Sequence, residues 1–130
     1  MQKSLIFIFI FGLIILGLFL MVFPDLINSE RIFEINDIRN SKRIVLKPNN
    51  NQGGIHSLSL MISGKSDGKI IISKAYSDSS IDFIDTVESR IDLNYSGDWY
   101  SDSCILFFEN INAKKTKLKI CFRFYGMNNL

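Results

Sequence analysis

Polar and apolar residues alternate along most of the chain after residue 42. The alternation is clearest at 57–62, 89–95 and 117–124, where every second residue is Leu, Ile, Phe or Tyr. A period of two places successive side chains on opposite faces of a strand, so each segment has one face for a core and one for water. Shorter strands are predicted at 43–47, 69–76, 81–85 and 103–109, which gives about seven strands.

Short stretches rich in Gly, Asn, Asp and Ser separate these segments, at 49–54, 64–68, 77–80 and 96–98. Such residues accept the backbone angles of tight reversals. Several short strands about ten residues apart, with no amphipathic helix between them, are typical of an antiparallel sandwich or small barrel. We therefore predict an all-β fold class, with a small antiparallel β-sandwich of about seven strands at residues 42–130.

The N-terminal part of the chain has a different pattern, because residues 5–23 are apolar without interruption. As a helix they would be about 28 Å long, close to the thickness of the hydrocarbon core of a bilayer. We predict a single transmembrane helix that acts as a signal anchor, with the lipid bilayer as its partner. A cleaved signal peptide is the alternative, although the bulky residues at 19–23 make a poor cleavage site.

Charges near the apolar run predict its orientation. Lys3 precedes the run and Asp25 is the first charge after it, and positive charge tends to stay in the cytoplasm. Residues 1–4 are thus predicted to be cytoplasmic and residues 24–41 to form a juxtamembrane connector. The sandwich would then be periplasmic or extracellular.

Two cysteines would pair if the last two strands formed a hairpin centred between Asn112 and Ala113. In that register Cys104 opposes Cys121, at a separation that a disulfide spans. An oxidising compartment would permit this bond, and two reduced thiols are the alternative.

The net charge of +2 conceals an uneven distribution along the sequence. Residues 78–109 are strongly acidic, whereas residues 110–130 contain five basic residues and no acid. Pairing between acidic and basic strands would explain this pattern. The alternative is a basic patch for an anionic polymer or lipid head groups, which would consist of Lys114, Lys115, Lys117 and Lys119.

The sequence GDWYSDS at 97–103 contains a candidate sugar-binding site. An exposed Trp99–Tyr100 pair could stack on a sugar ring while Asp98 and Asp102 accept hydrogen bonds from its hydroxyl groups. The same residues could instead close one end of the sandwich, with the indole N–H bonded locally.

No motif predicts catalysis, a metal site, a cofactor or nucleic-acid binding, and the single histidine, His56, has no recognisable catalytic partners. We therefore predict a non-enzymatic, membrane-anchored domain with a structural or protein-interaction role, in contact with envelope proteins. A glycan-binding module is the alternative.

Overall fold

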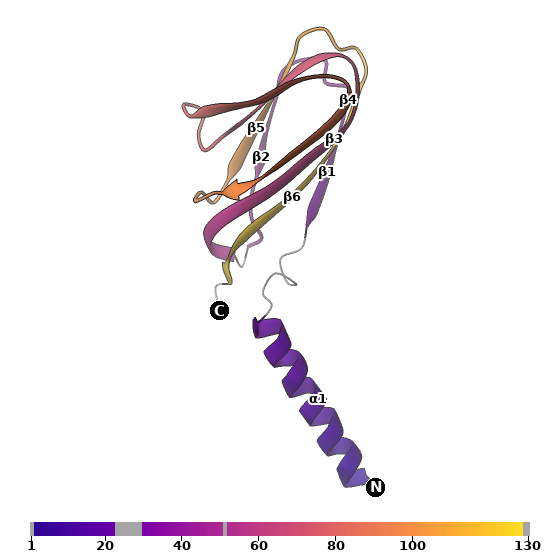
Figure 1. Ribbon diagram of the computed structural model, residues 1–130, viewed down its shortest axis with the longest axis vertical. Helices are drawn as coiled ribbons and strands as arrows, with labels where there is room; N and C mark the ends of the chain where they lie inside the picture. The colour runs from indigo at the N-terminus through magenta and orange to yellow at the C-terminus, as the bar shows by residue number, and fades with distance from the viewer. Residues whose placement is uncertain (1, 23–29, 51, 129–130) are drawn as a thin grey trace.

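The computed structural model describes residues 2–22, 30–50 and 52–128. One helix, α1 (Gln2–Val22), precedes the strands β1 (Arg31–Asn36), β2 (Lys42–Leu46), β3 (Gln52–Ala75), β4 (Ile81–Asp98), β5 (Cys104–Asn110) and β6 (Thr116–Asn128). The six strands are antiparallel and form one curled sheet in the order β1-β6-β3-β5-β2, with β4 on the other side of β3 (Figure 1). The β-sandwich class is thus confirmed, with six strands among the described residues in place of about seven.

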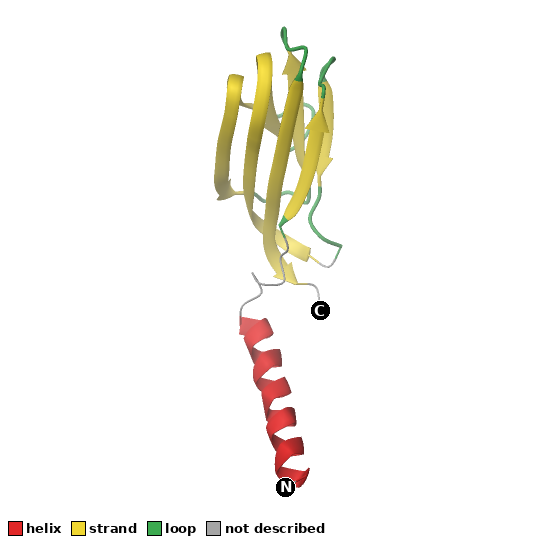
Figure 2. Cartoon of the chain, turned by 90° about the vertical axis from the view of Figure 1, so that its right-hand side faces the viewer, coloured by secondary structure: helices red, strands yellow, loops and turns green. Residues whose placement is uncertain are grey.

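Helix α1 stands apart from the sheet (Figure 2). In the described part of the chain, no helix has both the length and the hydropathy that crossing a membrane requires. The structure therefore confirms a helix at this position and does not support the predicted transmembrane span at 5–23, whose last residue, Phe23, lies outside the described residues. The predicted location of the sandwich stays a prediction.

The long strands β3 and β4 form a hairpin that takes part in both layers of the sandwich. Residues 52–66 of β3 pair with β6, and residues 70–75 pair with β5. We call β1, β6, residues 52–66 of β3 and residues 89–98 of β4 the β6 half. The β5 half consists of β2, β5, residues 70–75 of β3 and residues 81–87 of β4.

A corner in β3 turns the sheet from one half to the other. The predicted turn at 64–68 is this corner and not a reversal: between Ser66 and Ile70 the pairing of β3 with β4 shifts in register. Gly64 has a φ of 148°, and a Cβ at Gly68 would lie 2.7 Å from the backbone of Ala113. Only glycine allows both the backbone angle and the close approach. The predicted strands at 57–62 and 69–76 are therefore one strand, as are those at 81–85 and 89–95.

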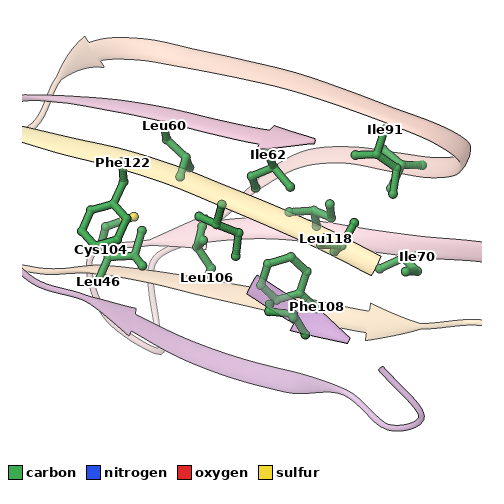
Figure 3. Packing of buried hydrophobic residues seen from close by; sticks show 14 of the residues in the cluster. Leu46, Leu60, Ile62, Ile70, Ile91, Cys104, Leu106, Phe108, Leu118 and Phe122 are labelled. Atoms are coloured by element: carbon green, nitrogen blue, oxygen red, sulfur yellow. The ribbon is translucent and has the colours of Figure 1, made fainter. Parts of the chain in front are cut away.

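The core lies between the two halves. Its side chains come from alternate positions on both, as the period of two predicts; they include Leu58, Leu60, Ile62, Ile70, Ile72, Leu106, Phe108, Leu118, Ile120, Phe122 and Phe124. Figure 3 shows side chains of the two halves packed against each other. Residues 31–36, in the predicted connector, form β1, which pairs with β6 and contributes Ile35 to the core.

The predicted disulfide is wrong, because the hairpin on which it depends does not form. Both β5 and β6 pair with β3, at different parts of its length, and do not pair with each other. Cys104 is buried in the core, and Cys121 is on the opposite face of its strand from the core residues Ile120 and Phe122; both are free thiols. Burial raises the pKa of the Cys104 thiol to about 12, so this thiol stays protonated near neutral pH.

Candidate functional site

The predicted aromatic pair is split between the interior and the surface. Trp99 has 0% of its surface exposed, whereas Tyr100 is 75% exposed. The indole Nε1–H donates to the carbonyl oxygen of Ser103 (3.0 Å), and the backbone N–H of Trp99 donates to that of His56 (3.0 Å). Both donors are therefore satisfied inside the protein, and the indole offers no open face to a sugar. Asp98 and Asp102 are exposed beside it.

Trp99 belongs to an aromatic cluster that holds the tip of the β3–β4 hairpin. The ring of Tyr76 stacks on the indole, with 4.0 Å between centroids, and Tyr95 contacts it edge-on at 6.4 Å. The Lys74 ammonium lies 4.6 Å from the Tyr95 centroid and donates to the Asp82 carboxylate at 2.9 Å. A buried ammonium requires such compensation. This contact therefore places Asp82 on the inner side of β4.

The placement of Asp82 turns its neighbours Ile81 and Phe83 outward, onto the outer face of the β5 half. Phe83 is 63% exposed and Ile81 is 55% exposed. Two rows of paired residues cross this face from strand to strand. One row is Arg43, Phe107, Ser73 and Phe83, and the next is Val45, Ile105, Ala75 and Ile81. Most of these side chains are apolar, whereas the solvent face of a sheet is usually polar. Ile105 and Ala75, in the middle of the second row, are buried, and the residues toward the ends of the rows are exposed.

A hollow of about 310 Å³ opens on this face, and it combines apolar and polar walls. Phe107 and Ile81 line it together with Ser41, Lys42, Arg43, Ser73, Phe108 and Glu109. The Arg43 guanidinium lies 6.0 Å from the Phe107 ring centroid, and its Nε–H donates to Asp78 at 2.9 Å. An apolar hollow with a few converging polar groups is the usual form of a ligand site.

Sequence reasoning missed this face, although one signal was present. Residues 104–108, CILFF, are apolar at every position, so the strand has an apolar outer face as well as an apolar inner one. Cys104, Leu106 and Phe108 enter the core, and Ile105 and Phe107 face outward. Alternation at 81–85 also places Ile81 and Phe83 on one face, but which face that is depends on the contact between Lys74 and Asp82.

The predicted basic patch is divided between a loop and a strand. Lys117 and Lys119 lie on the outer face of β6, whereas Lys114 and Lys115 lie in the loop before it. The backbone N–H groups of Lys115 and Lys114 donate to the Asp67 carboxylate at 2.8 and 2.7 Å. These bonds lower the pKa of Asp67, because they favour its charged form, and they attach the corner of β3 to this loop.

No protein family matches this sequence, and no curated protein matches it at a significant level. Solved structures show weak similarity in fold. A family 29 carbohydrate-binding module is 14% identical, with a TM-score of 0.39, over 76% of this chain and 79% of its own. A second such module, a variant complexed with cellulohexaose, is 15% identical, with a TM-score of 0.39, over 76% and 81%.

A pilus protein of Bacillus endospore appendages is 10% identical, with a TM-score of 0.44, over 77% of this chain and 88% of its own. At such low identities and TM-scores, the similarity is limited to the general β-sandwich arrangement.

Proposed function

We propose that this chain is a non-catalytic glycan-binding module whose binding surface is the outer face of the β5 half. One observation carries the proposal: the row Arg43–Phe107–Ser73–Phe83 places the exposed ring of Phe83 and the half-buried ring of Phe107 on one outer sheet face, beside a polar-rimmed hollow. Aromatic rings offer flat apolar surfaces, on which the C–H face of a sugar can pack. This surface replaces the predicted pair Trp99 and Tyr100.

The spacing of the two rings suits an oligosaccharide. Phe107 is on β5 and Phe83 on β4, with β3 between them. Two strand spacings are about 10 Å, which is comparable to the length of a disaccharide. The polar groups around the hollow, Lys42, Ser73 and Glu109 among them, are able to exchange hydrogen bonds with sugar hydroxyls.

Isothermal titration calorimetry tests this proposal: neutral hexasaccharides are titrated into the full chain in a non-ionic detergent, and the affinity is measured. Phe83→Ala and Phe107→Ala should each weaken binding about fivefold, since an aromatic contact contributes on the order of 1 kcal/mol. Tyr100→Ala is the matched control, because Tyr100 is also an exposed aromatic residue. Loss of binding in Tyr100→Ala alone would place the site at the predicted loop instead.

A protein partner is the second candidate, in line with the predicted structural or interaction role. Val45 and Ile81 are exposed on the same face, and aliphatic side chains do not stack on sugars as rings do. A contiguous exposed apolar patch often marks a protein contact. Val45→Ser, at a position outside the lining of the hollow, should weaken association with a protein partner severalfold and leave sugar affinity within about twofold.

A further inference from the structure

The outer face of the β6 half carries three cations in one row. Lys65 of β3 is paired with Lys117 of β6 on one side and with Arg90 of β4 on the other. Directly paired residues on antiparallel strands share a face. All three are exposed, whereas their sequence neighbours Leu118 and Ile91 are buried. We call Lys117, Lys65 and Arg90 the cation row.

No acidic side chain neutralises this row within the part of the chain that the structure describes. The two ion pairs formed there, Arg43–Asp78 and Lys74–Asp82, involve none of its members. Like charges directly opposite each other destabilise a sheet. The row therefore costs stability in the free protein, and bound negative charge would offset that cost.

Two hollows adjoin the row. The larger, of about 730 Å³, is lined by Lys65, Lys115 and Lys117 together with Asn36, Asp37, Ser66, Asp67 and Thr116. The smaller, of about 390 Å³, shares Lys65 and Lys117 and extends over Gly64 to Lys119 and Glu34. The shared lysines make the two hollows adjacent sections of one basic surface.

The larger hollow also contains an unmet hydrogen-bonding group. Thr116 is only 4% exposed, and its Oγ1 is the one buried side-chain polar atom in the described residues that has no hydrogen-bond partner. Buried polar atoms in folded proteins nearly always have partners. The unpaired Thr116 Oγ1 is evidence independent of the cations, and Thr116 is part of the wall of the same hollow.

We propose that the cation row and the larger hollow bind an acidic polysaccharide, a linear chain of sugars with carboxylate or sulfate groups. Three cations on adjacent strands extend over about 10 Å, so a small anion would meet one or two of them, whereas a chain with regularly spaced charges meets all three. The polar side chains of Asn36 and Thr116 suit sugar hydroxyls, and neither they nor the row offers an aromatic ring on which a nucleic-acid base would stack.

The neighbouring acids favour a chain over a membrane surface. Glu34 and Asp92 belong to the next outward-facing row, in which Glu34 is paired with Lys119 and Asp92 with Ser63. A flat anionic bilayer on this face would approach both carboxylates, whereas a polymer that follows the cation row avoids them. In the larger hollow the polymer meets Asp37 and Asp67, and the charge of Asp67 is already offset by two backbone N–H groups. The site is separate from the glycan surface of the β5 half, so either can fail without the other.

The test measures binding of immobilised polygalacturonate and dextran sulfate by the full chain in a non-ionic detergent. The triple variant Lys65→Gln, Arg90→Gln, Lys117→Gln should bind at least tenfold more weakly, and wild-type affinity should fall steeply with added salt, since each cation–anion contact releases counterions. The control triple Arg39→Gln, Lys47→Gln, Lys69→Gln makes the same charge change at exposed positions outside the row and outside the hollow of the β5 half.

Equal losses in the two triple variants would overturn the proposal, because net charge alone would then explain binding. Tighter binding to an oligonucleotide or to phosphatidylglycerol vesicles than to either polysaccharide would also overturn it. Thermal melting verifies that each triple variant is folded; removal of the repulsion should leave the Tm of the row variant unchanged or higher. Should that variant fail to fold, Lys65→Gln alone should still weaken binding severalfold.

Discussion

The two halves of the sandwich have the same inner pattern and different outer surfaces. Inside, each contributes alternate Leu, Ile and Phe side chains to one shared core. Outside, the β6 half displays the cation row and, two rows away, the apolar side chains of Ile32 and Met61, whereas the β5 half displays Phe83, Ile81 and Val45 beside Arg43. The core requires only that inner side chains be apolar and well packed. The outer surfaces are free of that requirement, so they can differ as the two proposed binding sites require.

The corner in β3 separates the two halves. Substitutions that disrupt this corner should have the largest effect on the free energy of unfolding. Gly64→Ala would place a Cβ against the carbonyl oxygen of Lys117 at a φ of 148°, and Gly68→Ala would bring one to 2.7 Å from the Ala113 backbone. Each should cost about 3 kcal/mol of unfolding free energy, measured by urea denaturation.

Gly97→Ala is the control for the corner variants. Its new Cβ would meet only the Tyr95 side chain, at 3.2 Å, so a cost of about 1 kcal/mol or less is expected. Similar losses in all three variants would mean that the corner has no special steric requirement.

The corner also shows where sequence reasoning reached its limit. The residues at 64–68 have the composition of a reversal, and that local composition is the same for a reversal and for a corner. What distinguishes the two lies far along the chain, in the bonds from Lys114 and Lys115 to Asp67. Inner faces were predictable because alternation is local, as the burial of Leu58, Leu60 and Ile62 illustrates.

Pairing between distant strands was not predictable, for the same reason. The cysteine register assumed that β5 and β6 are adjacent, and β3 pairs with both instead. For Trp99 the sequence left two interpretations, and its complete burial favours closure of the sandwich end. The cation row could not be predicted either, because Lys65 and Arg90 are brought beside Lys117 only by the pairing of three strands.

The outward orientation of Ile81 and Phe83 should depend on the ion pair that Asp82, the residue between them, forms with Lys74. Asp82→Ala leaves the Lys74 ammonium buried without a carboxylate, which should cost about 1–2 kcal/mol of unfolding free energy. The cost is no larger because Asp82 itself is largely exposed, and water screens its charge. Lys74→Met in the same background should recover most of the loss, since Met fills similar space without a charge. Denaturant melts of the two single variants and the double variant measure the coupling, and strictly additive effects would disprove it.

The buried thiol of Cys104 reports on the inner side of the β5 half. Because the pKa of Cys104 is raised in the folded state, its contribution to stability is fully present below the pKa of an unfolded thiol. That contribution is lost as the pH rises from there toward about 12. Between pH 8 and pH 10 the loss should be about 1–2 kcal/mol, measured as the difference in pH dependence between wild type and Cys104→Val. A disulfide would remove this difference, and would also shift mobility in non-reducing electrophoresis.

The smallest effect on stability should come from the exposed aromatic surface of the β5 half. Phe83→Ser removes a ring that is 63% exposed, so the free energy of unfolding should change by no more than about 0.5 kcal/mol. Binding of a hydrophobic dye to the folded protein should nevertheless fall, because the ring is a large part of the exposed apolar patch. Phe108→Ser, in a residue that is fully buried one position beyond Phe107, is the contrasting variant and should cost several kcal/mol. A loss of stability in Phe83→Ser that approaches that of Phe108→Ser would mean that the outer face of the β5 half serves the fold, and the contrast with the β6 half would then have a structural origin.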